Sequence, residues 1–245
     1  MREHAMLTQL VLGLHHLGYE SSPALLELFE TLRTELEHWN QRVNLTAITE
    51  PDEVELRHFL DSLTVLQVLG TYAPSGAGLR MVDVGTGAGF PGIPLKLVLP
   101  DAHLTLVEAT GKKVEFLRHM VATLNLADTE VIHGRAEDVA HLTGCRERYD
   151  LAVARGVAHL ATLAEICLPF VKIGGLFVAP KKGDLQAEID QAKFAVTRLG
   201  GEESRLVEVT LPQLRDQRYL VCSTKIAPSP ARYPRRSGMP FKHPL

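Results

Sequence analysis

Cysteine is scarce in this chain of 245 residues, which contains only Cys145, Cys167 and Cys222. The three are widely spaced and form no CxxC pair, so neither a metal site nor a redox dithiol is indicated and we expect reduced thiols. Long hydrophobic runs are lacking too, because no apolar stretch approaches the length that spans a bilayer and the first eight residues contain no apolar signal-peptide core. These absences argue against secretion and membrane insertion and predict a cytoplasmic protein.

Acidic residues are missing from one end of the chain. The net charge is −3, which by itself argues against a nucleic-acid partner, yet no Asp or Glu follows Lys225. The cations of this C-terminal segment are Lys225, Arg232, Arg235, Arg236 and Lys242. A basic segment can bind phosphates or simply be solvated surface, and charge alone does not decide between the two.

Two amphipathic patterns open the chain. Apolar residues recur at spacings of three and four over residues 22–43 and again over residues 52–69, which predicts two helices. Ser22 before Pro23 is typical of a helix start. Residues 72–78 form the only linker-like stretch nearby. We therefore divide the chain into an N-terminal helical element, residues 1–76, and a second domain, residues 77–245.

Beyond the linker, short apolar runs alternate with helix-length segments. The runs comprise residues 81–82, 104–107, 131–132, 151–153 and 176–178. This pattern is typical of βαβ units in a buried parallel sheet. Two closely connected strand candidates, about 204–211 and 218–226, should pair antiparallel. The predicted fold is an α/β, Rossmann-like sheet of the class I S-adenosylmethionine type with a terminal antiparallel hairpin, rather than that of a dinucleotide dehydrogenase.

A glycine-rich loop should connect the first strand to the first helix. Its glycines are Gly85, Gly87, Gly89 and Gly92. Glycine lets a ligand approach the backbone at the carboxyl edge of the sheet, so Gly85 and Gly87 are candidate cofactor contacts. Because the loop also satisfies GxGxxG, it is compatible with either a nicotinamide cofactor or S-adenosylmethionine.

Two acidic side chains help only partly to decide between the two cofactors. Asp83 precedes the glycines, and Glu108 ends the second strand, where it can accept hydrogen bonds from both ribose hydroxyls. An acid at this position argues against a 2′-phosphate but also occurs in NAD enzymes. Residues 133–138 follow the third strand and should lie beside an adenine.

The end of the fourth strand is informative through what it lacks. It has neither the Asn-Pro-Pro-aromatic tetrapeptide of amino-methylating enzymes nor a cysteine that could attack a pyrimidine ring. Arg155 stands there instead. An arginine at the edge of a buried strand needs a partner or a ligand, so we expect it in the site.

Motifs along the whole chain keep a characteristic order. They are Trp39-Asn40, Asn44 to Thr46, Arg57 to Ser62, Phe90 to Pro94, Glu108 with Lys112-Lys113, Gly134 to Glu137, Ala152 to Arg155 and Tyr233 to Leu245. In this order they resemble the bacterial small-subunit (16S) ribosomal RNA guanine-N7 methyltransferases, the RsmG or GidB family.

The resemblance implies S-adenosylmethionine as cofactor and 16S ribosomal RNA or the small subunit as partner. The cofactor contacts it implies are Gly85, Phe90, Glu108, Ala109, Thr110, Ala136, Glu137 and Arg155. The tail cations Arg232, Arg235, Arg236 and Lys242 would face RNA together with Lys181 and Lys182, either of which could take the family's lysine position. No metal is expected, and a monomer is favoured.

Guanine N7 offers a lone pair and carries no proton, so methyl transfer to it needs no general base. Catalysis should then rest on holding N7 in line with the methyl group, with Arg155 as a positioning residue. Two other functions remain open: an NAD-dependent oxidoreductase, which the glycine loop and Glu108 allow, and a ribosome assembly factor without turnover.

Overall fold

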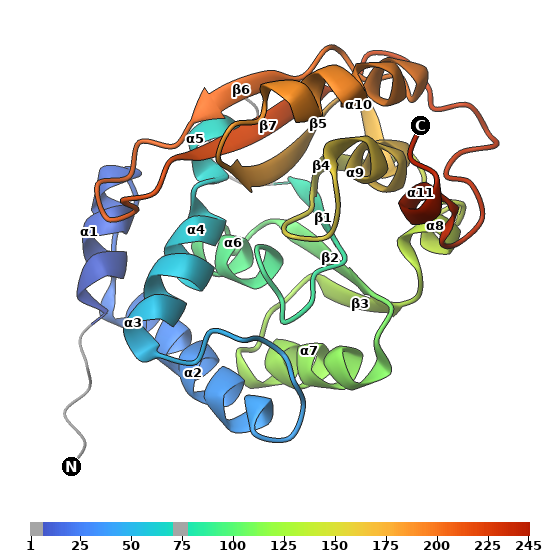
Figure 1. Cartoon of the computed structure of the whole chain (residues 1–245). Helices are drawn as coiled ribbons and strands as arrows, with labels where there is room; N and C mark the ends of the chain where they lie inside the picture. The colour runs from blue at the N-terminus through green and yellow to red at the C-terminus, as the bar shows by residue number, and fades with distance from the viewer. Residues whose placement is uncertain (1–6, 71–77) are drawn as a thin grey trace.

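The computed structural model describes residues 7–70 and 78–245. One seven-stranded sheet lies at the centre, with helices on both of its faces (Figure 1). The strand order is β3-β2-β1-β4-β5-β7-β6, in which only the pairings made by β7 are antiparallel. The strands are β1 (Arg80–Val84), β2 (His103–Glu108), β3 (Thr129–His133), β4 (Tyr149–Val153), β5 (Val171–Lys182), β6 (Arg205–Glu208) and β7 (Arg218–Thr224). The parallel sheet and its terminal antiparallel hairpin are therefore confirmed.

The N-terminal part of the chain is helical, as predicted. Its elements are α1 (Thr8–His16), α2 (Pro23–Asn40), α3 (Pro51–Val54), a π-helical turn η1 (Glu55–Leu60), α4 (Asp61–Leu63) and α5 (Leu66–Leu69). Ser22 caps α2 by accepting a hydrogen bond from Leu25 N–H at 3.2 Å, and Pro23 occupies the first turn. The single helix expected over residues 52–69 is instead divided by the π turn, and α1 was not predicted.

The two faces of the sheet bury different sets of alternating residues. Met81 and Leu104 belong to the hydrophobic core shared with α1, α2, α6 (Gly92–Val98) and α7 (Gly111–Thr123). Val82 and Val107 belong to the core on the other face. That core is completed by α8 (Ala136–Val139), α9 (Leu160–Cys167), the 3-10 turn η2 (Leu168–Phe170) and α10 (Gln186–Arg198). The helical element thus shares one core with the sheet. The expected boundary between residues 76 and 77 itself lies outside the described residues.

The C-terminal tail is folded against the body of the protein and ends with α11 (Met239–Lys242), at the right of Figure 1. Arg146 donates hydrogen bonds to the carbonyl oxygens of Ser229 at 2.9 Å and Tyr233 at 2.8 Å. Thr162 of α9 donates to the carbonyl oxygen of Pro240 at 2.9 Å. These contacts fix the course of the basic segment along α8 and α9.

Candidate functional site

A cleft of about 290 Å³ opens at the carboxyl ends of the central strands. Five of the predicted site residues line it: Gly85, Gly87, Phe90, Glu108 and Arg155. The N-terminal element adds Leu45, Thr46 and His58 to the same cleft. The structure therefore brings together the glycine loop after β1, the acid that ends β2 and the arginine after β4.

The glycine loop leaves open space beside its backbone at one position. Gly87 has a φ of +63°, and a Cβ built on it would meet no atom within 4 Å. Gly89 has a φ of +89°, but a Cβ there would lie 2.4 Å from the Ile93 side chain. Gly87 thus leaves open space next to the backbone, whereas Gly89 allows the loop to pack closely on α6.

Glu108 ties the glycine loop to the start of α7. One carboxylate oxygen accepts a hydrogen bond from Gly87 N–H at 3.0 Å and the other accepts from Thr110 N–H at 2.8 Å. Each carboxylate oxygen can accept about two hydrogen bonds, so both retain capacity. The carboxylate can therefore accept hydrogen bonds from two neighbouring hydroxyls while it holds the loop.

Asp83 lies beneath the same loop and is completely buried. Its Oδ2 accepts hydrogen bonds from the Thr86 hydroxyl at 2.6 Å and from Gly92 N–H at 2.7 Å, while no partner of Oδ1 is found in the described part of the chain. Burial raises the pKa of this carboxyl to about 6. Asp83 is thus the internal support of the turn.

Arg155 projects from the end of β4 toward the N-terminal element. Its Nη1 donates to the carbonyl oxygen of Arg57 at 2.9 Å and to Asp61 Oδ2 at 2.7 Å, and its Nη2 donates to His58 Nδ1 at 3.1 Å. The guanidinium carbon lies 5.6 Å from the centroid of the Phe90 ring. A guanidinium has five N–H donors, so within the described residues the Nε–H and one Nη2–H are left without a partner.

His58 completes this side of the cleft. Its ring lies parallel to the Phe90 ring, with 4.4 Å between centroids and 4° between planes. Burial, followed by the charge of Arg155, lowers the pKa of His58 to about 4, so the imidazole is neutral at neutral pH. Because Arg155 can only donate, Nδ1 is the acceptor and Nε2–H donates to the Thr46 hydroxyl at 2.8 Å.

The spacing of residues predicted no role for Thr46, His58 or Asp61. All three lie within the motifs that carry the family resemblance, and that resemblance was the only signal in the sequence for them.

The remaining predicted cofactor contacts do not line this cleft. Ala109 and Thr110 follow Glu108, and Ala136 and Glu137 begin α8. Glu137 is buried and accepts a hydrogen bond from Gly238 N–H of the tail at 2.7 Å.

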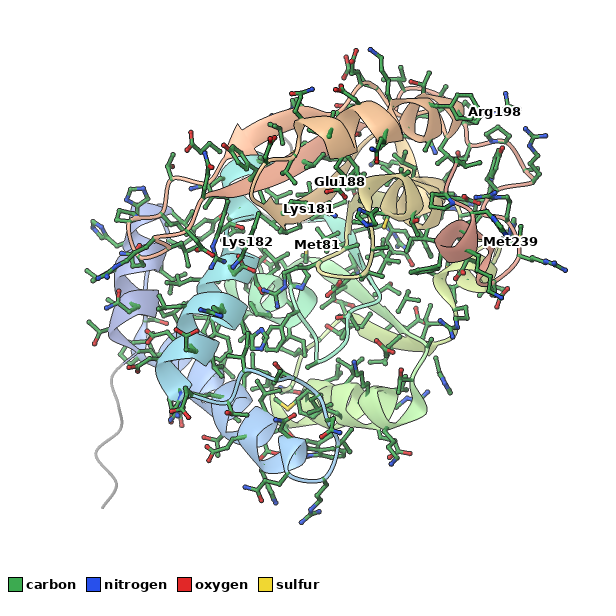
Figure 2. All side chains as sticks on the ribbon, viewed as in Figure 1. Met81, Lys181, Lys182, Glu188, Arg198 and Met239 are labelled. Atoms are coloured by element: carbon green, nitrogen blue, oxygen red, sulfur yellow. The ribbon has the colours of Figure 1, made fainter. Side chains whose placement is uncertain are left out.

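The predicted RNA-binding cations fall into two groups. Lys181 and Arg235 are paired internally: Lys181 with Glu188 at 2.7 Å (Figure 2), and Arg235 with the fully buried Glu165 at 2.6 Å. Lys182 pairs at 2.7 Å with Asp216, and both side chains are about half exposed. Arg232, Arg236 and Lys242 are exposed on the tail. Arg235 therefore anchors the tail, which charge alone did not predict.

Comparison with known proteins identifies the family. The sequence model described as GidB, rRNA small subunit methyltransferase G, matches residues 25–219. A protein of Dehalococcoides mccartyi strain BAV1 named ribosomal RNA small subunit methyltransferase G is 46% identical over 239 residues, or 98% of this chain and 100% of that protein. One of the same name from Roseiflexus castenholzii is 47% identical and covers 90% of this chain and 92% of its own length. The chain belongs to this family.

The family of rRNA small subunit methyltransferase G consists of S-adenosylmethionine-dependent enzymes. This excludes both alternatives, the NAD-dependent oxidoreductase and the assembly factor without turnover.

Solved structures agree on the fold. A MtNAS variant has a TM-score of 0.55 at 15% identity and covers 87% of this chain and 76% of its own. A predicted O-methyltransferase of Agrobacterium tumefaciens has a TM-score of 0.51 at 18% identity, covering 66% and 81%.

The residues that line the cleft are suited to the chemical groups of S-adenosylmethionine. Open space beside Gly87, a carboxylate with spare acceptor capacity at Glu108 and aromatic surface at Phe90 lie in one cavity. Across residues 7–70 and 78–245, no cluster of His, Cys, Asp and Glu could hold a metal ion. In the same part of the chain, no helix has the length and hydropathy needed to cross a membrane.

Proposed function

We propose that this enzyme transfers the methyl group of S-adenosylmethionine to N7 of a guanine in 16S ribosomal RNA, and that the cleft beside Arg155 is where transfer takes place. One observation carries the proposal. The open backbone at Gly87 and the carboxylate of Glu108 line the same cleft as an arginine that retains two N–H donors.

The cofactor would lie along the glycine loop, with its ribose hydroxyls donating to Glu108. Gly85, Phe90 and Arg155 line the same cleft. Ala109 and Thr110 after β2, and Ala136 and Glu137 at the start of α8, would border the adenine. S-adenosylmethionine supplies a methyl group bound to a positively charged sulfur, which a lone pair can accept in line.

The donors of Arg155 favour guanine over adenine. Guanine presents two acceptors, O6 and N7, on its major-groove edge, whereas adenine presents an amino group in place of O6. Arg155 can donate to O6 and leave the N7 lone pair for the methyl group. Since N7 has no proton, neutral His58 needs to serve only as a hydrogen-bond acceptor for Arg155. An opened RNA region is required, because side chains cannot reach this edge within an A-form helix.

The RNA would extend from the cleft across exposed cations. Arg232, Arg236 and Lys242 on the tail and Lys182 at the end of β5 are the exposed members of the predicted set. Lys181 and Arg235 would act by holding α10 and the tail in place. The expected setting is the cytoplasm, with the enzyme acting as a monomer.

Nucleoside mass spectrometry tests this function. Small-subunit RNA from cells that lack the protein should contain one 7-methylguanosine fewer than RNA from cells that have it. Plasmid-borne wild-type protein should restore the nucleoside, and Arg155→Ala should not. Loss of a different methylated nucleoside would contradict N7 as the acceptor, and full restoration by Arg155→Ala would contradict the role of Arg155.

A further inference from the structure

The guanidinium of Arg155 forms one end of a chain of alternating charges. Asp61 accepts from Arg155 through Oδ2 at 2.7 Å and from Arg218 Nη1 through Oδ1. Arg218 Nε donates to Asp216 Oδ1 at 2.6 Å, and Asp216 Oδ2 accepts from Lys182 at 2.7 Å. The order is therefore Lys182, Asp216, Arg218, Asp61, Arg155.

This chain runs from the surface into the cleft. Side-chain exposure is 48% for Lys182 and 50% for Asp216, but 5% for Arg218, 12% for Asp61 and 15% for Arg155. Lys182, labelled in Figure 2, ends β5 and lies opposite Arg218 in the register with β7. Asp61 thus joins three parts of the fold: the N-terminal element, the loop after β4 and the start of β7.

The π-helical turn η1 places Asp61 and a backbone carbonyl group next to the guanidinium of Arg155. Asp61 N–H donates to the carbonyl oxygens of Leu56 and His58. In a regular α-helix it would donate to the carbonyl oxygen of Arg57, four residues earlier. That carbonyl instead accepts from Arg155 Nη1. Isolated π turns of this kind are frequent at functional sites.

We propose that Asp61, held by Arg218, is a positioning residue that fixes the orientation of Arg155 in the cleft. The Asp61 carboxylate and the Arg57 carbonyl engage Nη1, while His58 engages Nη2. Together they leave the Nε–H and the second Nη2–H for the target base. The inference rests on the proposed function, because it assigns the partners of an arginine that the function places at the guanine.

The alternative is that Asp61 only neutralises buried Arg218. A double-mutant cycle separates the two roles, measured as single-turnover transfer of radiolabelled methyl groups to small subunits that lack the modification. Asp61→Asn keeps the shape of the side chain and should slow transfer by roughly tenfold to a hundredfold, as expected for a misplaced active-site group. In an Arg155→Gln background the same change should have little further effect.

Asp150→Asn is the matched control. Asp150 lies near the start of β4, the strand that Arg155 follows, where it accepts from Arg80 N–H and pairs with Lys172. This variant should transfer methyl groups at the wild-type rate. If Asp61→Asn fails to fold, the double variant with Arg218→Gln removes both buried charges and should fold while transferring slowly.

Each outcome has one meaning. Equal slowing by Asp61→Asn in both backgrounds, or no slowing in either, would overturn the positioning role. A crystal structure of the folded Asp61→Asn variant provides a second measurement: the guanidinium of Arg155 should be displaced, and an unmoved guanidinium would also overturn the inference. Wild-type transfer by Arg155→Gln alone would instead contradict the proposed function.

Discussion

The imidazole of His58 is stacked on the ring of Phe90 and accepts a hydrogen bond from Arg155. His58 belongs to the π-helical turn and Phe90 to the glycine loop, so this pair joins the N-terminal element to the carboxyl edge of the sheet. The arrangement requires an uncharged ring, because a protonated His58 could no longer accept from Arg155.

This pair predicts a pH dependence of stability. The pKa of His58 falls from 6.5 to about 4 on folding, so between these values the unfolded state binds the proton and the folded state does not. Stability contributed by neutral His58 is therefore lost as the pH falls through this window, by about 2 kcal/mol from pH 7 to pH 5. Urea unfolding at the two pH values measures the change.

Comparison with His58→Gln isolates this effect from Asp83. The pKa of Asp83 is raised to about 6 from 3.8 on folding, so its contribution has the opposite sign and increases as the pH falls. His58→Gln retains Asp83 and should lose less stability than the wild type between pH 7 and pH 5. Equal losses in the two proteins would contradict a neutral, buried His58.

Gly87→Ala, compared with a control, should distinguish the loss of space for the cofactor from the strain of a side chain at positive φ. Gly18 is a matched control, since its φ is +81° and a Cβ there would also meet nothing within 4 Å. Alanine at either position should cost about 1 kcal/mol of stability through its positive φ. Only Gly87→Ala should weaken S-adenosylmethionine binding in calorimetry, by more than tenfold. Equal affinities of the two variants would place the cofactor elsewhere.

Glu108→Gln should weaken cofactor binding without changing the fold. The amide replaces one acceptor oxygen with a donor, which would face Gly87 N–H, Thr110 N–H or a ribose hydroxyl. Hydrogen bonds to a charged group contribute roughly 1.5–3 kcal/mol, so affinity should fall about tenfold to a hundredfold. Glu130→Gln, at an exposed position of the neighbouring strand β3, should bind normally, and calorimetry with both variants checks the expectation.

The strands and the glycine loop were predictable because their signals are local. Short apolar runs identified the strands of the sheet, and glycine spacing identified the turn at Gly85 and Gly87. Helix α1 was missed because it has no side-chain cap at its start. The π turn could not be predicted, because a single regular helix would have had the same spacing of apolar residues.

The partners of Arg155 could not be predicted from spacing. Asp61 lies 94 residues from Arg155 and 157 residues from Arg218, so only the folded chain brings the three together. The same holds for Arg235, whose partner Glu165 is 70 residues away. An arginine in a basic run carries no local sign that its charge is paired internally.

The tail supplies the last prediction, which separates RNA binding from structural anchoring. Replacing Arg232, Arg236 and Lys242 with serine removes three exposed charges and leaves the ion pair between Arg235 and Glu165 intact. RNA affinity should fall, and the slope of log affinity against log salt should become shallower by about 0.7 for each phosphate that is no longer neutralised. Melting temperature and S-adenosylmethionine affinity should stay at wild-type values.

Arg235→Ser is the counterpart in the same segment. It leaves fully buried Glu165 without its cation and should destabilise the protein by roughly 3 kcal/mol. Below its melting transition, this variant should keep the wild-type salt slope, because Glu165 already engages the Arg235 guanidinium in the wild type. A wild-type salt slope in the triple variant would show that the exposed tail cations do not bind RNA. An unchanged melting temperature in Arg235→Ser would show that Arg235 does not anchor the tail.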